Sequence, residues 1–214
     1  DIMAFAFWCR KSNISKLKKE FSDGKLRLGL GTVFHIAPSN VPVNFAFSFV
    51  FGLLSGNANI VRVPSKRFPQ IDIICSVIDL LFVSDKYRKI RAMTTFVRYE
   101  ATDDITGMFS AKCSARLIWG GDSTIRNIRN SPISERSVDI AFADRYSICA
   151  INANEFIYEK EPKKIANGFY NDTYLLDQNA CTSPHLVIWV GTITNVKKSQ
   201  LIFWDNLHSI VKEK

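Results

Sequence analysis

The chain has 214 residues, of which 47% are hydrophobic and 22% are charged, and this balance excludes a disordered polypeptide. The formal net charge of +8 favours anionic partners such as nucleotides, coenzyme A, nucleic acid or an acidic membrane surface. Basic residues stand in short clusters such as residues 16–20 and form no long tract, so the charge is weak evidence for nucleic-acid binding, and no nucleic-acid partner is expected.

The cysteines limit the metal and redox chemistry of the chain. They are far apart and form no CxxC pair, which argues against a zinc site and against a disulfide framework. A cytoplasmic location is expected, because free thiols persist in a reducing compartment. The most apolar run, residues 41–54, contains Pro42 and Asn44 and is shorter than the roughly 20 residues of a membrane span, so we expect a buried helix there. The five cysteines are Cys9, Cys75, Cys113, Cys149 and Cys181.

Hydrophobic periodicity predicts a succession of helices and strands. Residues 2–21 have roughly helical spacing, and a glycine-containing turn follows at 22–31. In the middle of the chain, the expected strands are 31–37, 59–64, a segment within 93–100, and 115–121, and the expected helices are 41–54, 68–82, 103–112 and one beginning at 122. Later elements are expected as extended runs at 137–143 and 147–152, a helix over 155–171, a strand at 185–191 and a helix from about 196.

The alternation of strands and helices between residues 31 and 130 predicts an α/β fold with a parallel sheet covered on both faces. In such sheets ligands bind at the carboxyl ends of the strands. The turns after the first, second and fourth expected strands are therefore candidate sites. They read PSNVP, VPSK and GGDST.

The GGDST turn is suited to a phosphate. Gly120 and Gly121 allow close approach to the backbone, and Asp122, Ser123 and Thr124 are good N-cap residues for the helix that follows. An ordinary capped turn explains the same residues. The sequence contains no GxGxxG, so a standard dinucleotide fingerprint is absent.

The VPSK turn follows the strand that meets the adenosine ribose in dinucleotide folds. An acidic residue there would bond the ribose hydroxyls, but this turn offers Arg62, Ser65, Lys66 and Arg67 instead. Positive charge suits a 2′-phosphate, which indicates NADPH over NADH. The alternative is a solvated basic turn.

The PSNVP turn holds Asn40 between two prolines, which fix the backbone. A rigidly held amide is what an oxyanion hole needs, because its donor must be in place before negative charge develops. Pro38 and Ser39 of the same turn are expected beside the cofactor. In the alternative interpretation, Asn40 only bonds the backbone of its own turn.

Cys181 lies in the polar loop DQNACTSPH, between an expected helix and an expected strand. A structural cysteine usually has apolar neighbours, and a metal ligand usually has a second ligand two to four residues away. Cys181 has neither, which leaves a reactive nucleophile or an incidental thiol.

Together these motifs resemble the LuxC family of acyl-CoA reductases, which belongs to the aldehyde dehydrogenase superfamily and includes the fatty acid reductase of bacterial luminescence. The resemblance is carried by residues 35–66, 117–129, 140–147 and 177–187. It implies a Rossmann-like cofactor domain over residues 1–146, followed by the start of an aldehyde-dehydrogenase-type catalytic domain over residues 147–214.

The resemblance also implies roles for single residues. Cys181 would take the acyl group, with its own N–H and the Asn40 amide as oxyanion donors. Ser65 and Lys66 would lie at the adenosine ribose, where many aldehyde dehydrogenases read KPSE; here Val63 replaces the lysine and Lys66 the glutamate. The residues implied near the pyrophosphate are Gly121, Asp122 and Ser123.

Two departures from the superfamily pattern stand out. Residues 142–151, which match the stretch with the general-base glutamate, contain no glutamate, so water would not be activated against the thioester. Family members are also roughly twice as long. The implied function is NADPH-dependent reduction of a long-chain acyl-CoA to the aldehyde, and the alternative is a truncated, inactive member that acts as a binding or scaffold protein.

Further expectations follow from the resemblance. An acyl-protein synthetase is a candidate partner, and an oligomer is expected. His185, four residues from Cys181, is a candidate for proton transfer, and His35 is expected to be structural. A chain cut off at Lys214 would leave apolar strand faces such as residues 186–190 exposed, and it would associate in solution with little or no activity.

Overall fold

The structure is a computed structural model that describes residues 1–21, 24–100, 104–175, 178 and 180–214. Contacts within the chain divide it into two compact units, Asp1–Ala143 and Asp144–Lys214. The division expected after residue 146 lies close to this boundary.

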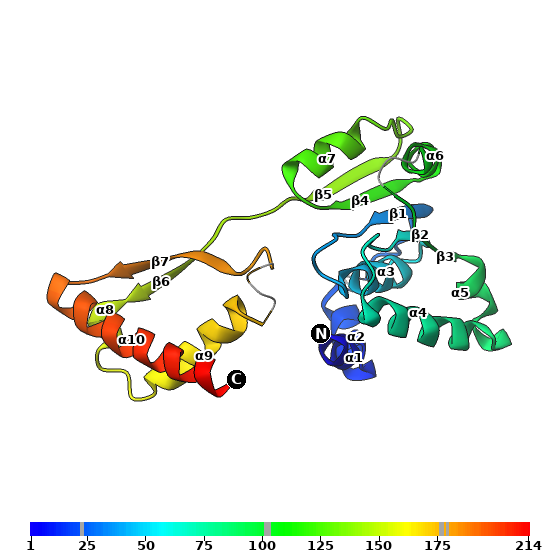
Figure 1. Cartoon of the computed structure of the whole chain (residues 1–214). Helices are drawn as coiled ribbons and strands as arrows, with labels where there is room; N and C mark the ends of the chain where they lie inside the picture. Colours follow the sequence, from blue (N-terminus) through cyan, green and yellow to red (C-terminus); the bar gives the residue numbers. More distant parts are fainter. Residues whose placement is uncertain (22–23, 101–103, 176–177, 179) are drawn as a thin grey trace. The chain divides into compact units, whose positions relative to one another are not determined.

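The first unit is built on a parallel sheet (Figure 1). Within the described residues its strands have the order β3-β2-β1-β4-β5, and every neighbouring pair is parallel. The strands are β1 (Thr32–Ile36), β2 (Ala58–Arg62), β3 (Thr94–Val97), β4 (Ala115–Trp119) and β5 (Val138–Phe142). The α/β class and the parallel sheet expected from the sequence are therefore confirmed.

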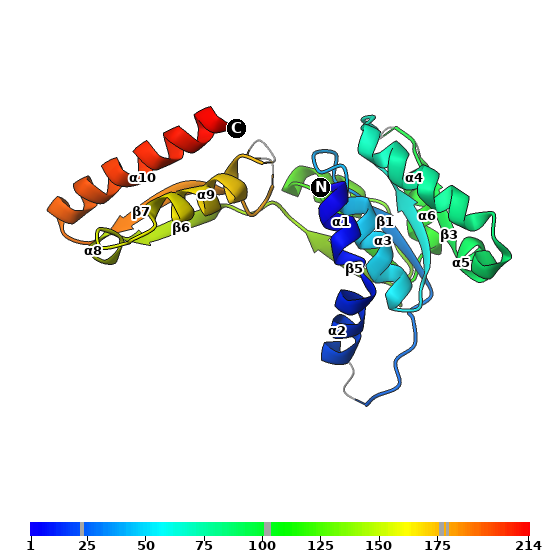
Figure 2. The same ribbon diagram turned by 90° about the horizontal axis from the view of Figure 1, so that it is seen from below.

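Helices of the first unit cover both faces of the sheet (Figure 1). They are α1 (Ile2–Trp8), α2 (Lys11–Phe21), α3 (Asn44–Leu54), α4 (Pro69–Phe82), the 3-10 helix η1 (Asp85–Tyr87), α5 (Arg88–Ala92), α6 (Ile105–Lys112) and α7 (Asp122–Arg129). The sequence did not predict η1 and α5. The helical stretch expected over residues 2–21 is divided between α1 and α2, and α1 lies beside α3 (Figure 2) through ring contacts of Phe5 and Trp8 with Phe47.

The core of the first unit has two halves, one on each face of the sheet. Helices α3 and α4 pack on one face through residues such as Phe45, Phe49 and Ile71. Helices α6 and α7 pack on the other, where Phe34 and Ile118 of the sheet are fully buried. The apolar run of residues 41–54 is thus largely a core helix, as expected. In the part of the chain that the structure describes, no helix is both long enough and apolar enough to cross a membrane.

The second unit is a smaller layer of two parallel strands and three helices within the described residues. These elements are β6 (Ser147–Asn152), α8 (Ala153–Phe156), α9 (Pro162–Thr173), β7 (Pro184–Val190) and α10 (Ile193–Glu213). The prediction of a single helix over residues 155–171 is wrong. Pro162 begins α9 and interrupts the helix, because proline donates no N–H and disfavours helical geometry at the residue before it. Helix α10 begins three residues earlier than expected, where Thr192 caps it by accepting from the Asn195 N–H at 3.4 Å.

Within the described residues of the second unit, helices cover one face of the β6–β7 sheet. Cys149, Ile151, Val187 and Trp189 pack against a core of helix residues that includes the fully buried Phe203. The alternate side chains face away from this core, and the exposed ones among them are Ile148, Leu186, Ile188 and Val190. The exposure expected for residues 186–190 therefore holds for one face of the strand, because successive side chains of a strand point to opposite faces.

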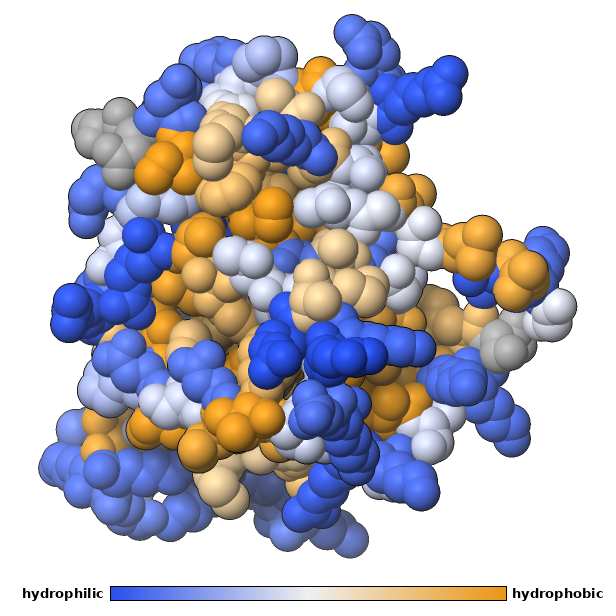
Figure 3. Space-filling model, turned by 90° about the vertical axis from the view of Figure 1, so that its right-hand side faces the viewer, coloured by the Kyte–Doolittle hydropathy of each residue, from blue (hydrophilic) through white to orange (hydrophobic). Residues whose placement is uncertain are grey.

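Apolar surface is also exposed on the first unit. Figure 3 shows one side of the molecule, where hydrophobic patches lie among hydrophilic side chains. Exposed apolar residues of α4 include Ile73, Val77 and Leu80. They are interspersed with polar residues of the same helix, such as Asp72, Ser76 and Asp79.

Candidate functional site

The turns after β1, β2 and β4 lie at one edge of the first unit's sheet. Ile36 is paired in register with Arg62 on one side and with Ile118 on the other. Because the strands are parallel, their carboxyl ends share one edge, and the strand order reverses between β1 and β4, where such folds bind their ligands. The structure thus brings the turns at residues 38–40, 62–66 and 120–123 to the same edge.

The turn after β1 carries Pro38, Ser39 and Asn40. Pro38 is half-buried, and Ser39 and Asn40 are exposed. The strand ladder continues into the turn, since the Ala37 N–H donates to the Arg62 carbonyl at 3.3 Å. The amide of Asn40 therefore lies on the surface of this edge, close to the end of β1.

His35 supports this turn from inside the core. It is fully buried, with Nδ1 2.8 Å from Ser48 Oγ and Nε2 2.9 Å from Asn59 Oδ1. Burial lowers the pKa of His35, and the hydrogen bond with Asn59 opposes this effect without reversing it. His35 joins β1 to α3 and β2, which is the structural role expected for it.

The turn after β2 is organised around a contact that the sequence did not reveal. Arg62 Nη2 donates to the Tyr99 carbonyl at 3.2 Å and lies 3.4 Å from Ser65 Oγ, and its guanidinium stacks 4.6 Å from the Tyr99 ring centroid. Ser65 Oγ also donates to the Tyr99 carbonyl, at 3.1 Å. Arg62 therefore fixes the turn, while Lys66 and Arg67 are exposed at its outer side. Lys66 Nζ lies 5.0 Å from the Phe68 ring centroid.

The turn after β4 leads into α7. Gly121, rather than one of residues 122–124, is the N-cap of α7, and no side chain caps this helix. The expectation of a side-chain cap is therefore wrong, because the N-cap position falls on Gly121, one residue before the side chains that could cap the helix. Gly120 allows close packing, since a Cβ there would lie 3.1 Å from Thr124 Cγ2. Asp122 and Ser123 are exposed in the first turn.

In the second unit, hydrogen bonds hold the loop of Cys181 on both sides. The Cys181 carbonyl accepts from Ser147 Oγ at 2.8 Å, which joins it to the start of β6. The buried Ser183 donates from Oγ to the Asp172 carbonyl at 2.9 Å, and its N–H donates to the Ala180 carbonyl at 2.9 Å. These bonds fix the backbone of the loop and leave the Cys181 side chain exposed.

Exposure distinguishes Cys181 from the other thiols of the chain. Cys113 is buried, and Cys9, Cys75 and Cys149 are half-buried. Burial is the main cause that raises the pKa of each of these four thiols. A raised pKa lowers the fraction of a cysteine that is present as thiolate, and the thiolate is the nucleophilic form. Cys181 is the one exposed thiol among the described residues.

His185 lies at the start of β7, and its ring stacks on Tyr146 with 5.3 Å between the ring centroids. Its role in proton transfer stays a prediction. Asp177 and Asn179 of the cysteine motif lie outside the described residues. Residues 142–151 form the end of β5, a connection and most of β6, and Asp144 is their single carboxylate.

The site residues predicted from the sequence are divided between the two units. Asn40 and the residues expected to bind the cofactor are in the first unit, where they share one sheet edge. Cys181 is in the second unit with Ser147 and Ser183, which fix its loop. No local pattern in the sequence indicated Tyr99 as the partner of Arg62, because the two residues are far apart in the chain.

The chain was compared with models of known protein families and with curated proteins. The family model described as acyl-CoA reductase (LuxC) matches residues 13–201. A search of curated proteins finds no match.

Solved structures of aldehyde dehydrogenases share the fold. An aldehyde dehydrogenase from Bartonella henselae has a TM-score of 0.66 at 14% identity, over 89% of this chain and 41% of that one. A glyceraldehyde-3-phosphate dehydrogenase from Methanocaldococcus jannaschii, solved with NADP, has a TM-score of 0.66 at 13% identity, over 84% and 38%. An NAD-dependent benzaldehyde dehydrogenase from Corynebacterium glutamicum has a TM-score of 0.63 at 14% identity, over 85% and 38%. The chain thus spans about two fifths of the length of these structures.

Proposed function

This chain belongs to the LuxC family of acyl-CoA reductases, and on that premise we propose that it serves the NADPH-dependent reduction of a long-chain acyl-CoA to the aldehyde. The observation that carries the proposal is the exposed thiol of Cys181 in a loop whose backbone is fixed by Ser147 and Ser183. A fixed backbone with an accessible thiol suits nucleophilic attack, because the geometry is prepared before the substrate arrives.

In the proposed reaction, the Cys181 thiolate attacks the acyl-CoA carbonyl. A bond forms between Cys181 Sγ and the acyl carbon, the bond to the coenzyme A sulfur breaks, and coenzyme A leaves as its thiolate. The N–H of Cys181 would donate to the oxyanion, and the family resemblance adds the Asn40 amide as a second donor. Loss of one such donor typically costs about 2.7–4 kcal/mol of barrier.

The acyl-enzyme must survive until it is reduced. Residues 142–151 carry no glutamate that could activate water against the thioester. This absence favours a reductase over a hydrolytic dehydrogenase. A bound reduced nicotinamide would supply the hydride. After hydride addition, Cys181 is released as a thiolate when the thiohemiacetal collapses to the aldehyde, and His185 is the candidate for the accompanying proton transfer.

The residues at the carboxyl edge of the sheet fit a dinucleotide. The N-terminus of α7 has no side-chain cap, so its N–H groups suit a phosphate. Arg62 Nε is buried and finds no hydrogen-bond partner among the described residues, which leaves a donor at the adenosine-ribose turn. Asp122 is the one unfavourable feature, because its carboxylate would lie near an anion.

The preference for NADPH rests on Lys66 and Arg67. Arg62 is engaged with Tyr99 and Ser65, so we assign contact with the 2′-phosphate to the exposed Lys66, with Arg67 beside it. No carboxylate is present at residues 62–67 to repel a 2′-phosphate or to bind the ribose hydroxyls.

Two measurements test the proposal, and the first is a turnover assay. In a turnover assay with a long-chain acyl-CoA, NADPH consumption should match aldehyde formation, and Cys181→Ala should abolish both, whereas Cys149→Ala retains activity. Turnover by Cys181→Ala would refute the mechanism.

The second measurement is cofactor affinity. Lys66→Glu should weaken NADPH binding about tenfold, or roughly 1.4 kcal/mol, with little effect on NADH. Lys86→Glu is the matched control, because Lys86 is also an exposed lysine near an aromatic ring but precedes β3 instead of following a strand. Asp122→Asn should tighten both cofactors. Equal affinities of the unmodified protein for NADPH and NADH would count against the assignment.

The second candidate function is that of an inactive binding or scaffold protein. Binding of NADPH without any turnover would support this candidate.

A further inference from the structure

The turn after β3 reaches the carboxyl edge of the first unit's sheet through one residue, Tyr99. β3 pairs in parallel with β2, and Val97 lies opposite Arg62 at the carboxyl ends of the two strands. The ladder extends one residue further, since the Val63 N–H donates to the Val97 carbonyl at 3.0 Å. Tyr99 follows two residues later and contacts the turn at residues 62–66.

The position of the Tyr99 side chain is set by the core. It is 7% exposed and belongs to the same buried cluster as Phe34 and Ile118. Its Oη lies 2.9 Å from Thr106 Oγ1 of α6. Because a protein core is closely packed, a side chain held in this way keeps one position. Tyr99 can therefore support the surface turn that it contacts.

Tyr99 holds two side chains of the neighbouring turn in one arrangement. The Arg62 guanidinium lies 4.6 Å from the Tyr99 ring centroid, and Nη2 donates to the Tyr99 carbonyl at 3.2 Å. An aromatic face and a carbonyl acceptor are both favourable partners of a guanidinium. The same Nη2 lies 3.4 Å from Ser65 Oγ, so Arg62 transmits the restraint to Ser65.

The Tyr99 carbonyl also determines the role that is left for the Ser65 hydroxyl. A hydroxyl has one donor hydrogen and two acceptor lone pairs. Ser65 Oγ donates its hydrogen to the Tyr99 carbonyl at 3.1 Å, and Arg62 Nη2 approaches one lone pair. Ser65 can therefore accept from a ligand but cannot donate to it. A ribose hydroxyl can donate to Ser65, whereas an ionised phosphate only accepts and requires a cation such as the exposed Lys66.

We propose that Tyr99 is a positioning residue for the adenosine ribose of the cofactor. Tyr99 holds Arg62 by stacking and by a hydrogen bond, and it orients Ser65 as an acceptor toward a ribose hydroxyl. NADPH and NADH share this ribose, so Tyr99 supports the binding of both, and the preference between them is left to Lys66. The inference rests on the cofactor-binding part of the proposed function and is independent of Cys181.

Fluorescence titration with NADPH and with NADH measures the effect of Tyr99 without any turnover. Tyr99→Leu should weaken both cofactors about tenfold, because Arg62 must then be ordered when the cofactor binds. Tyr99→Phe keeps the ring and the carbonyl, so its affinities should stay within about twofold of the unmodified protein. Tyr87→Leu is the matched control, since the Tyr87 ring also lies near a cation, with Lys86 Nζ at 5.4 Å, but precedes β3.

The ratio of the two affinities distinguishes Tyr99 from Lys66. Tyr99→Leu should leave the ratio of the NADPH and NADH dissociation constants unchanged, whereas Lys66→Glu should change it. Ser65→Ala alone should weaken both cofactors. The double variant Tyr99→Leu with Ser65→Ala should bind no more weakly than Tyr99→Leu, because Ser65 has already lost its orientation.

Arg62→Lys provides a second variant that leaves the buried ring in place. Lysine keeps the charge but lacks the planar guanidinium that stacks and forms several hydrogen bonds. This variant should also weaken both cofactors in parallel. In the free protein, hydrogen exchange of residues 65–67 should be faster in Tyr99→Leu and in Arg62→Lys than in the unmodified protein, and Tyr87→Leu should not change it.

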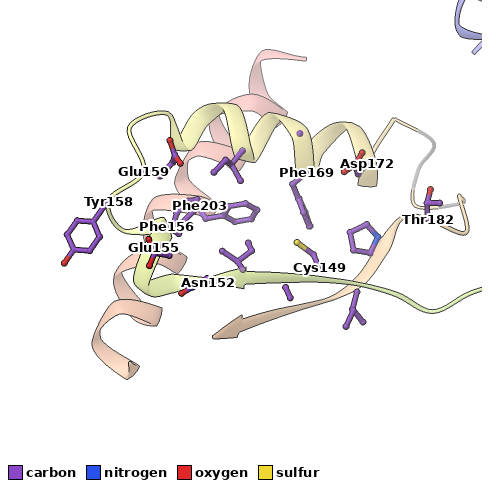
Figure 4. Close-up of a pocket in the computed structure, with 16 residues that line it drawn as sticks. Cys149, Asn152, Glu155, Phe156, Tyr158, Glu159, Phe169, Asp172, Thr182 and Phe203 are labelled. Atoms are coloured by element: carbon purple, nitrogen blue, oxygen red, sulfur yellow. The ribbon is translucent and has the colours of Figure 1, made fainter. Parts of the chain in front are cut away.

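The thiols show whether each variant is folded. Cys113 is buried in the same cluster as Tyr99, so its resistance to alkylation shows that this core is intact. Cys149 reports on the second unit, where it faces Phe169 across a cavity of about 790 Å³ (Figure 4). Affinities are compared between variants in which both thiols keep the protection that they have in the unmodified protein.

The outcomes separate this inference from the proposed reaction. Unchanged affinities in folded Tyr99→Leu and Arg62→Lys would overturn the inference and leave the proposed reaction standing. An effect on NADPH alone would also overturn it, because Arg62 would then act on the 2′-phosphate. If the unmodified protein bound neither cofactor, the inference and the proposed cofactor would both fail. Parallel weakening in a protein without acyl-CoA turnover would support the inference while the proposed reaction fails.

Discussion

The two units of this chain cover their sheets differently. In the first unit, helices pack on both faces of the sheet, and four successive residues of β1, from Val33 to Ile36, are buried. In the second unit, helices cover one face, and exposed and half-buried residues largely alternate along β6 and β7. The difference shows that a continuous buried strand needs two layers of helices, whereas a sheet covered on one face exposes the apolar side chains of its other face.

The two units also differ in net charge. Residues 144–214 carry equal numbers of acidic and basic side chains, so the net charge of +8 resides entirely in residues 1–143. The basic unit is the one whose sheet edge is suited to a phosphorylated cofactor. The neutral unit contains the exposed thiol of Cys181. The expected anion site and the thiol thus belong to different units.

The largest effect is expected from truncation of the second unit's central aromatic residue. Phe203 is fully buried and contacts the rings of Phe156, Phe169 and Trp189. Phe203→Ala should cost about 3–5 kcal/mol, which is comparable to the whole stability of so small a core. Hydrogen exchange resolved by peptide should show loss of protection from β6 to α10 and none in the first unit. Loss of protection in both units would contradict the expectation that the second unit unfolds separately from the first.

A smaller effect is expected from the buried ion pair of the first unit. Arg116 is buried, and it bonds both Asp139 oxygens, at 3.2 and 3.1 Å. Asp139→Ala should destabilise the first unit by about 3 kcal/mol, because the guanidinium is left without its counter-charge. Asp72→Ala is the matched control, since its pair with Arg98 is exposed and should cost about 0–1 kcal/mol.

The same pair makes the first unit sensitive to acid. Burial opposes ionisation of Asp139, but the hydrogen bonds and charges of Arg116 and Arg129 outweigh burial and hold its pKa below the ordinary value of 3.8. The stabilisation is therefore present above pH 3.8 and is lost as the pH falls through the lower pKa of the folded state. Asp139→Ala should remove this part of the acid dependence in thermal unfolding curves.

Association in solution tests the uncovered face of the second unit. Leu186, Ile188 and Val190 are exposed on one face of β7. We expect concentration-dependent association in sedimentation, and Leu186→Lys with Val190→Lys should raise its dissociation constant about tenfold or more, because charge would replace apolar contact. Ile73→Lys with Val77→Lys, on α4 of the first unit, is the control. A monomeric unmodified chain would contradict the prediction.

The smallest effect is expected from the buried histidine of the first unit. The pKa of His35 is below its ordinary value of 6.5 in the folded chain, so the unfolded chain binds more protons just below pH 6.5. Stability of the first unit should therefore fall as the pH falls through 6.5 and then level off below the folded pKa. His35→Gln should flatten this dependence. An unchanged pH profile in a folded His35→Gln variant would show that another group is responsible.

The elements of the first unit were largely predictable because its sequence has strong local signals. Buried runs such as residues 32–36 and the helical period of residues 69–82 are visible without the structure. The order of the strands in the sheet could not be predicted, because it depends on contacts between distant segments of the chain. The break before Pro162 was visible in the sequence as a glutamate–proline pair, but the apolar period on both sides concealed it.

Some features of the candidate site were likewise predictable from the sequence, and others were not. Cys181 and the turns at residues 38–40 and 120–123 are recognisable as motifs. The contact of Arg62 with Tyr99 and the burial of Arg116 are products of tertiary packing, and no local pattern encodes them.

The central claim is that Cys181 accepts an acyl group, and mass spectrometry tests it most directly. The protein is incubated with an isotopically labelled long-chain acyl-CoA in the absence of cofactor, and its peptides are analysed for acylated cysteine. We expect labelled Cys181, loss of the label in Cys181→Ala, and an unchanged label in Cys149→Ala. A label that persists in Cys181→Ala, or that lies on another cysteine of the unmodified protein, would contradict it.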